Sequence, residues 1–583
     1  MNINRREFLH LSLIAAVSCS RVAKGGPEQA LENIYNFPTN GDVRILHTTD
    51  SHAQLLPVYF REPDINLGFG ENLNRPPHLV GKAFLDHFNI PENSPEAHLF
   101  TYLNFTEEAK KYSKVGGYEY IATLIKKLRS DIGADRCMLI DGGDSLQGSG
   151  TAYWTKGQDM IGAMNLLKVD AMTGHWEFTY EEEQIRKNIA DFNGDFIAQN
   201  VFLTEEAQFD EIEAYDEDTG QVFPGYKIKE MNGHRVCVIG QAFPYTPIAN
   251  PQRFIPNWTF GIRESELNSL VSKVKKTESP DVVILLSHNG MDVDLKVASM
   301  VPGIDIIMGG HTHDGIPAAI PIKNSGGVTH VTNGGSHGKF VGCFDLKIKN
   351  NSLDDFEYRL LPVFPSILSS DKEMSEYITK VRAPYVSKLN KKLGVSNELL
   401  YRRGNFSGTS DQVICNALRK QLDADISLSP GFRWGSTILP GQDILIEDVM
   451  NLTGMTYPET YVREMSGEEL KLILEDVADN LFNSDPYLQQ GGDMVRVGGL
   501  NYTLNPTAEF GKRISTLTLD DGSIVEANKK YKVAGWSTVG SQSDGPPIWD
   551  VVSDYIMDMQ TVTLEKFNQP KLVGIKDNLG IAT

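Results

Sequence analysis

Five short motifs rich in Asp and His recur between residues 50 and 313 of this 583-residue chain. Each follows directly after a short apolar run that predicts a buried strand. In open α/β sheets, sites form outside the carboxyl ends of the strands, so motifs at strand ends are expected to converge in space. The motifs are Asp50-Ser51-His52, Asp141-Gly142-Gly143-Asp144, Gly174-His175-Trp176-Glu177, Ser287-His288-Asn289-Gly290 and Gly309-Gly310-His311-Thr312-His313.

This inventory of side chains suits a dinuclear metal centre that hydrolyses a tetrahedral anion. One carboxylate must bridge the two ions, and imidazoles with another carboxylate fill the remaining positions. Mixed oxygen and nitrogen ligands suit manganese, iron or zinc and do not distinguish among them. A lone D-x-H or H-x-H motif is better explained by a solvated or packed histidine. Five such motifs at strand ends favour the metal centre.

The apolar runs alternate with helical patterns, which predicts an α/β layered domain. Helices are expected at 118–129 and 266–275, and strands at 43–47, 136–140, 171–173, 196–199, 236–239, 282–286 and 304–308. An insertion at about 55–112, rich in Pro, Asn and Phe, interrupts this pattern. A segment of that length is usually functional or a lid, and a passive surface excursion is the equal alternative.

A polar, charged segment at 366–393 predicts a linker helix, after which a second strand and helix pattern begins. Strands are expected at 425–428, 460–465, 514–519 and 532–534, with helices at 411–422 and 467–479. The chain therefore predicts two large domains, as its length also favours.

Composition places the chain among ordinary globular proteins, with 40% hydrophobic and 22% charged residues. A net charge of −21 and a pI near 5.1 argue against a nucleic-acid groove, which is normally basic. An acidic surface still permits an anionic substrate, because bound metal ions reverse the local field. The five cysteines form no CxxC pair, and buried thiols are favoured over a disulfide framework.

The first residues have the layout of a secretory signal. Arg5-Arg6 precede a modest apolar run, which indicates a twin-arginine signal over residues 1–24 and a periplasmic location. The run is too short to span a bilayer, and no later stretch is long and apolar enough to be a transmembrane segment. Cys19 follows Ala16-Val17-Ser18, a weak match to a lipidation site, so a lipid anchor at Cys19 is the alternative to simple cleavage.

The five motifs in this order resemble the metallophosphoesterase domain of periplasmic 5′-nucleotidases. The second half is similar as well: Ala424-Asp425-Ile426 and Gly431-Phe432-Arg433 look like the substrate-binding strand and loop of the 5′-nucleotidase C-terminal domain. The resemblance implies an α+β four-layer sandwich at 41–365, the linker helix at 366–393, and an α/β substrate domain at 394–575.

The resemblance also implies the ligands of two divalent metal ions. One ion is expected to be held by Asp50, His52, Asp144 and His313, and the other by Asp144, His175, His288 and His311. Asp144 is the expected bridge. Asp141 and Glu177 are expected to support these ligands rather than bind metal.

The third motif departs from the nucleotidase pattern G-N-H-E-F-D. The Asn ligand is replaced by His175, and Trp176 and Thr179 stand where the family has its catalytic His and Asp. Loss of a positioned acid costs about 10²–10⁴-fold on ordinary phosphate esters. A thiolate leaving group, with a pKa near 8.5, depends less on a proton donor.

These departures resemble the SoxB branch of the family, the sulfur-oxidation thiosulfohydrolases, as do Arg75-Pro76-Pro77-His78 and Gly157-Gln158-Asp159-Met160. That resemblance implies hydrolysis of a cysteine S-thiosulfonate on the flexible arm of a SoxYZ-like sulfur carrier protein, with release of sulfate. It also implies two ions, usually assigned as Mn²⁺, and we expect a monomer. A broad phosphoesterase or 5′-nucleotidase, and a metal-stabilised subunit without activity, are the alternatives.

Three further residues are candidates for contact with the substrate. Arg433 is expected to donate to sulfonate oxygens, since a guanidinium matches them in bidentate fashion; a structural ion pair is its alternative role. Trp176 is expected to line the channel for the arm, with core packing as its alternative. Tyr487 is a weaker candidate for the same wall.

Overall fold

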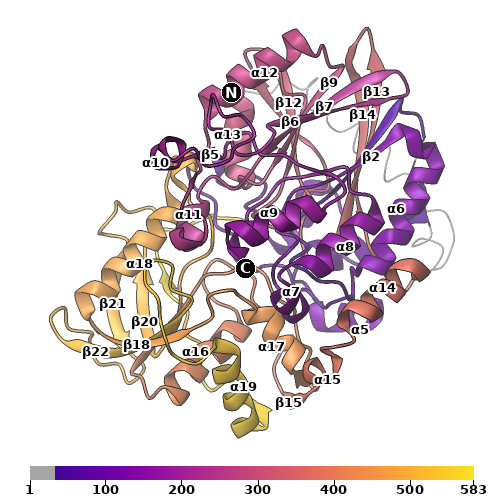
Figure 1. The fold of residues 1–583 in the computed structure, drawn as a ribbon. Coiled ribbons are helices and arrows are strands. Elements are labelled where there is room, and N and C mark those ends of the chain that lie inside the picture. The colour runs from indigo at the N-terminus through magenta and orange to yellow at the C-terminus, as the bar shows by residue number, and fades with distance from the viewer. Residues whose placement is uncertain (1–32, 38, 583) are drawn as a thin grey trace.

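The computed structural model describes residues 33–37 and 39–582. The first domain is built on two six-stranded sheets (Figure 1). The predicted signal and Cys19 lie outside the described residues. The first sheet has the order β14 (Ser352–Pro362), β13 (Phe340–Lys349), β1 (Val43–Thr48), β2 (Cys137–Asp141), β3 (Ala171–Met172), β4 (Asp195–Phe196). The second has the order β11 (Ile320–Asn324), β12 (Gly327–Asn333), β10 (Ile306–Gly309), β9 (Val282–Ser287), β7 (His234–Gln241), β6 (Tyr226–Met231).

The two sheets pack face to face through an apolar core. Ile45, Ile140 and Phe344 of the first sheet share one buried cluster with Val238 and Ile284 of the second. Helices cover the outer faces: α6 (Tyr118–Ile132), α7 (Gly150–Thr155), α8 (Gln158–Leu167) and α9 (Glu182–Asp191) on the first sheet, and α12 (Glu264–Thr277) and α13 (Met291–Met300) on the second. The predicted four-layer α/β sandwich is confirmed.

Within each sheet, the strands that precede the motifs are parallel. β1 pairs with β2 and β2 with β3, while β9 pairs with β10 in the second sheet. The carboxyl ends of these strands therefore lie at one edge, and the chain places its Asp and His residues immediately after them. Antiparallel strands, β13–β14, β11 and β6, complete the sheet edges.

The predicted linker segment contains α14 (Lys372–Arg382) and α15 (Val386–Leu389). The second domain, orange to yellow in Figure 1, follows with a sheet of order β18 (Thr460–Ser466), β22 (Lys530–Trp536), β16 (Ile426–Ser429), β19 (Arg496–Gly498). Two three-stranded sheets flank it: β17 (Asp443–Leu445), β15 (Lys392–Ser396), β23 (Thr561–Val562), and β21 (Ile514–Leu519), β20 (Leu500–Leu504), β24 (Lys571–Leu572). Its helices are α16 (Thr409–Gln421), α17 (Ile446–Thr453), α18 (Gly467–Phe482) and α19 (Ile548–Met559).

The start of α18 shows how local sequence sets an element boundary. Ser466 Oγ accepts from the Glu469 backbone N–H at 3.2 Å, and the Glu469 carboxylate accepts from the Ser466 N–H at 2.6 Å. This reciprocal capping box satisfies two donors that a helix start leaves without partners. The S-x-x-E spacing therefore fixes where the helix begins.

The insertion lies between the two domains and carries α3 (Gly81–Phe88), α4 (Pro95–Phe100) and α5 (Phe105–Tyr112). The Tyr59 carbonyl accepts from the Thr437 N–H at 2.7 Å, and the Ile65 carbonyl accepts from the Asn405 N–H at 3.1 Å. Residues near the end of the described chain join it, since the Asn66 N–H donates to the Gly580 carbonyl at 2.7 Å. The insertion thus connects both domains beside the motif edge.

Two other predictions concern cysteines and the membrane. Cys137, Cys237, Cys343 and Cys415 are buried and form no disulfide, which confirms the expectation for these four. Among the described residues, none of the helices has the length and apolar character that a membrane crossing requires.

Candidate metal centre

The structure brings the seven predicted metal ligands together in two buried groups. One contains Asp50, His52, Asp144 and His313, and the other contains Asp144, His175, His288 and His311. Within each group the ligand atoms all lie within 4.8 Å of one another. Asp144 belongs to both groups, which is the arrangement that a bridging carboxylate requires.

Short distances surround the Asp144 carboxylate. Its Oδ2 atom lies 3.0 Å from His288 Nε2, 3.3 Å from His175 Nδ1 and 3.7 Å from His52 Nε2. In the first group, His313 Nε2 lies 3.0 Å from His52 Nε2 and 3.3 Å from Asp50 Oδ1. Several of these buried nitrogens, including both of His311 and Nε2 of His175, have no hydrogen-bond partner. Buried polar atoms are rarely left unpaired, so the donor set fits bound cations.

The orientation of His288 illustrates how the fold prepares a ligand. Its Nδ1–H donates to the Gly142 carbonyl at 2.6 Å, which leaves Nε2 as the nitrogen with the lone pair. A second hydrogen bond of this kind fixes both the tautomer and the ring direction of a metal-binding imidazole.

The backbone at the site is unusual. Five of the seven residues have positive φ angles: Asp50 at 50°, His52 at 45°, Asp144 at 56°, His311 at 70° and His313 at 62°. Non-glycine residues seldom adopt this conformation, and strained residues cluster at functional sites. The sheet edge therefore holds the ligand side chains at a cost in backbone energy.

Two further carboxylates hold the loops that carry the ligands. The Glu177 carboxylate accepts from the N–H groups of Asp144 at 3.1 Å and His175 at 2.8 Å, as well as from Ser145 and Leu146. The Asp141 carboxylate accepts from Thr48 Oγ1 and Ser145 Oγ, each at 2.8 Å. Neither belongs to the two groups, in agreement with the supporting role expected for both.

Burial and neighbouring charge set the protonation of the site. Burial lowers the pKa of His52 to about 4, so its imidazole is neutral near pH 7. Burial acts to raise the pKa of Asp144, but His175 and His288 outweigh it and hold that pKa well below its ordinary value. Metal ligands must be deprotonated to bind, and the pKa shifts of His52 and Asp144 favour that state. Burial acts to lower the pKa of His288, but the charges of Asp144 and Asp50 outweigh it and raise that pKa to about 10, while burial raises the pKa of Asp50 to about 8. These two groups must therefore lose a proton when a cation binds.

An aromatic wall occupies the position where the nucleotidase pattern has its catalytic dyad. The Trp176 ring lies 5.3 Å from the Trp434 ring and 5.7 Å from the Phe432 ring, and Trp434 stacks on His52 at 5.5 Å. Trp176 and Trp434 are 5% and 2% exposed. Thr179 Oγ1 lies 2.6 Å from Thr456 Oγ1 of the second domain. Trp176 thus packs across the domain interface next to ligand His175.

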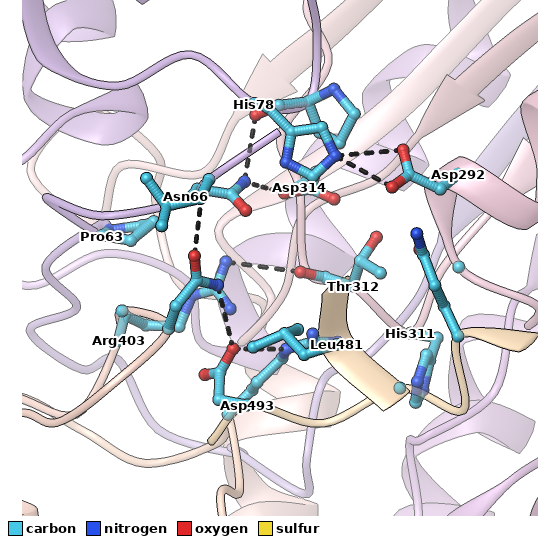
Figure 2. Close-up of a pocket in the computed structure, with 18 of the residues that line it drawn as sticks. Pro63, Asn66, His78, Asp292, His311, Thr312, Asp314, Arg403, Leu481 and Asp493 are labelled. Atoms are coloured by element: carbon cyan, nitrogen blue, oxygen red, sulfur yellow. Dashed lines mark hydrogen bonds and ion pairs between the residues drawn. The ribbon is translucent and has the colours of Figure 1, made fainter. Parts of the chain in front are cut away.

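Arg433 lies beside the metal ligands in a pocket between the domains, which Figure 2 shows with His311 and Asp493 labelled. Its Nε lies 3.4 Å from Asp493 Oδ1, and its NH2 donates to the Gly492 carbonyl at 2.6 Å. Its buried NH1 has no partner. The structure therefore gives Arg433 both an ion pair and a free donor.

Tyr487 is placed at the outer seam between the domains. Its hydroxyl donates to Glu264 Oε2 at 2.8 Å, and the Lys296 ammonium lies 3.8 Å from its ring centroid. Trp176 instead contacts Phe432 and Trp434. Among the described residues no ring contact joins Tyr487 to Trp176, so a wall that contains both stays a prediction.

The structure adds three residues that the motifs did not reveal. Arg403 lines the pocket in Figure 2 and donates to the Thr312 carbonyl at 3.3 Å. Phe243 stacks on His311 at 4.1 Å, and Trp434 stacks on His52. Trp434 follows Arg433 directly in the sequence, so its position next to a candidate substrate residue could have pointed to it. Phe243 follows none of the five motifs.

Comparison with known proteins finds a family that matches part of the second domain and relatives that match most of the chain. Residues 393–553 match the family described as "5′-nucleotidase, C-terminal domain". Protein UshA of Yersinia enterocolitica is 24% identical over 487 residues, covering 74% of this chain and 83% of that protein. The 5′-nucleotidase of Vibrio parahaemolyticus is 25% identical, covering 66% of this chain and 75% of its own length.

Among solved structures, the sulfate thiohydrolase SoxB of Thermus thermophilus superposes with a TM-score of 0.85 at 31% identity, covering 93% of this chain and 98% of that chain. A 5′-nucleotidase precursor from the same organism has a TM-score of 0.70 at 17% identity, with 91% and 99% covered, and shows the shared fold. With two domains of this architecture, a buried dinuclear ligand set and these relatives, the chain belongs to the 5′-nucleotidase family of hydrolases.

Proposed function

We propose that this chain is a thiosulfohydrolase of the SoxB type, which releases sulfate from a cysteine S-thiosulfonate on a SoxYZ-like carrier protein. The observation that carries the proposal is Trp176 at the position of the family's catalytic His. Its buried indole packs against Phe432 and Trp434 and offers no acid for a leaving group. The 31% identity to the solved SoxB supports the same substrate class.

The reaction needs water, and its atoms balance without a redox partner. Water attacks the terminal sulfonate sulfur, the S–S bond breaks, and the products are a cysteine persulfide anion, sulfate and two protons. The persulfide leaves as an anion, since thiols have pKa values near 8.5 and need little protonation. An apolar wall beside the breaking bond is compatible with a soft sulfur leaving group, and it would keep bulk water away from that bond.

The residues of the two groups would hold two divalent ions, for which we propose manganese. Such ions supply Lewis acidity and a nucleophile near neutral pH. The chain itself orients the ligands through Glu177 and Gly142. Arg433 lines the pocket with His311 and pairs with Asp493, and it would offer its unpaired NH1 to the anion. We place the enzyme in the periplasm, exported by the twin-arginine signal of residues 1–24.

The test is sulfate release from a carrier whose cysteine bears a thiosulfonate. The wild type should release sulfate, and Asp144→Asn should lose activity because the shared carboxylate is weakened as a ligand. AMP is the comparison substrate. Fast AMP hydrolysis without sulfate release would reject the proposal.

A 5′-nucleotidase or broad phosphoesterase is the second candidate. It is favoured by the fold and by the curated relatives, which include 5′-nucleotidases. A phosphate and a sulfonate are both tetrahedral anions, so one pair of metal ions serves either. The same two assays separate the candidates.

A further inference from the structure

One loop of the second domain crosses to the first domain and returns over the metal centre. This loop, residues 483–493, is called the strap here; it begins where α18 ends at Phe482 and precedes β19. Where the strap reaches the first domain, the Lys296 ammonium on α13 lies 2.5 Å from Asp485 Oδ1. The Tyr487 hydroxyl donates to Glu264 at the start of α12, and the Tyr245 hydroxyl donates to the Tyr487 carbonyl. We call these three interactions the latch contacts.

The returning half of the strap is fixed to the substrate-binding loop. The Asp493 N–H donates to the Gly431 carbonyl at 2.9 Å, and the Gly492 carbonyl accepts from Arg433 NH2 at 2.6 Å. The strap is therefore held at both ends, by the first domain at Tyr487 and by the second domain at Asp493.

Between these anchors, Gly491 lies directly against metal ligand His311. A Cβ atom built on Gly491 would stand 2.2 Å from His311 Nε2, closer than real contacts allow. Both Gly491 and Gly492 have positive φ, at 78° and 76°. Only a glycine fits at residue 491, because any side chain there would enter the space of the His311 ring.

We propose that the strap is the specificity-determining wall of the active site. It closes the His311 side of the metal centre and admits an anion on a slender extended chain, while it excludes anions on broad groups such as nucleosides. The latch contacts determine how rigidly the strap is held in this position. The inference uses the metal site of the proposed function but is independent of which anion is hydrolysed there.

The experiment compares slender and broad members of two substrate classes with the metal-loaded full chain. The thiosulfonates are a Gly-Gly-Cys-Gly-Gly peptide with the modified cysteine, and the same peptide with Trp on each side of it. The phosphate esters are methyl phosphate and AMP. The class that is hydrolysed tests the proposed function, and the slender-to-broad ratio within that class tests the strap.

The latch variant is Lys296→Ala with Glu264→Ala, which removes two latch partners on the first domain. The matched control is Lys273→Ala with Glu266→Ala, which removes the same two charge types and likewise an acidic residue in the first turn of α12. We expect the slender-to-broad ratio of kcat/KM to fall about tenfold in the latch variant, the scale of steric discrimination by a pocket. The control should keep the wild-type ratio.

Hydrogen exchange checks that the strap itself responds. Amides of residues 487–492 should exchange about tenfold faster in the latch variant, as expected for local opening, and at the wild-type rate in the control. An unchanged exchange rate would overturn the latch assignment. Faster exchange with an unchanged substrate ratio would overturn the role in specificity.

A second pair of variants tests the contact with His311. Gly491→Ala and Gly492→Ala share the strain of a positive φ, but the nearest atom to a Cβ on Gly492 is the Gly431 carbonyl oxygen at 3.8 Å. We expect Gly491→Ala to bind less metal per chain than Gly492→Ala and to lose activity on slender substrates too. Equal metal content and activity in the two variants would contradict the proposed close approach.

Discussion

The backbone N–H of Trp176 donates to Asp144 Oδ1 at 2.8 Å. The residue that departs from the family's dyad therefore also orients the carboxylate shared by both ligand groups. The bond comes from the backbone, so the side chain at residue 176 can change while Asp144 keeps its direction. A substitution at residue 176 can therefore change the aromatic side chain beside the site while the backbone hydrogen bond to the Asp144 carboxylate is kept.

Restoring the dyad should increase phosphatase activity. The double variant Trp176→His with Thr179→Asp should hydrolyse AMP at least about tenfold faster than the wild type, because a positioned acid contributes about 10²–10⁴-fold. Its sulfate release should fall, since the aromatic wall is opened. Steady-state kinetics on both substrates measure this. Trp176→Phe is the control, and a similar gain in that variant would mean that space rather than an acid was limiting.

Replacing Glu177 should weaken metal binding without touching a ligand. Glu177→Gln leaves a single acceptor oxygen for the N–H groups of residues 144–146 and 175. Loss of such support typically lowers metal affinity about 10–100-fold. Metal titration by calorimetry gives the affinity. Glu181→Gln, adjacent to the first turn of α9 (Glu182–Asp191), is the control. An affinity equal to that of the wild type would show that the loops hold without the carboxylate.

Removing metal should lower the melting temperature. Nε2 of His175 and both ring nitrogens of His311 are buried without a hydrogen-bond partner, so ions that bind only the folded state should stabilise it. A ligand at a hundred times its Kd contributes about 2.7 kcal/mol. Scanning calorimetry with chelator and then with added Mn²⁺ follows the change. His288→Ala should show a much smaller metal-dependent shift, and an equal shift in both proteins would place the bound ions elsewhere.

Stability should depend on pH through a buried carboxyl group outside the two ligand groups. Burial raises the pKa of Asp159 from its ordinary value near 3.8 to about 6, and its Oδ2 has no hydrogen-bond partner. A raised carboxyl pKa means that stability is lost as pH rises from about 4 to about 6, since ionisation is costlier in the folded state. Asp159→Asn removes this loss. Relative to wild type, it should gain about 1–3 kcal/mol at pH 8 and nothing near pH 4.

Urea unfolding at the two pH values, with chelator present in both, measures the difference. Asp135→Asn, on the short helix before β2, is the control and should show no such pH-dependent gain. A gain for Asp159→Asn that is the same at both pH values would assign it to packing rather than to ionisation.

The strands next to the motifs were predictable because their side chains are buried on both faces. Val43–Thr48 and Val282–Ser287 are buried throughout. Residues 282–286 form a continuous apolar run, as expected for a fully buried parallel strand, whereas Arg44 interrupts the apolar residues of the first strand. The long hairpin β13–β14 was not predicted. Much of β14 is exposed or half-buried, and its turn uses Asn350 and Asn351 at positive φ, a polar sequence that gives little signal.

The site shows the same contrast. Residues that follow strands, such as Asp50 and His288, were predictable because the topology of parallel sheets brings them to one edge. Phe243 lies two residues past β7 (His234–Gln241) at the same edge, but an apolar ring at a strand end gives no signal for a metal site. Gly491 and Arg403 were not predictable, since they reach the centre on loops of the second domain and across the domain interface. Their positions depend on how the domains pack, which local patterns do not encode.

The connection between the insertion and residues 578–582 has a consequence for biosynthesis. The Val80 N–H donates to the Leu579 carbonyl, and the Ala582 N–H donates to the Asp64 carbonyl. The ribosome delivers all seven candidate ligands long before it reaches these residues. The insertion, although it is made early, therefore gains these hydrogen bonds only after every candidate ligand of the metal-binding edge has been synthesised.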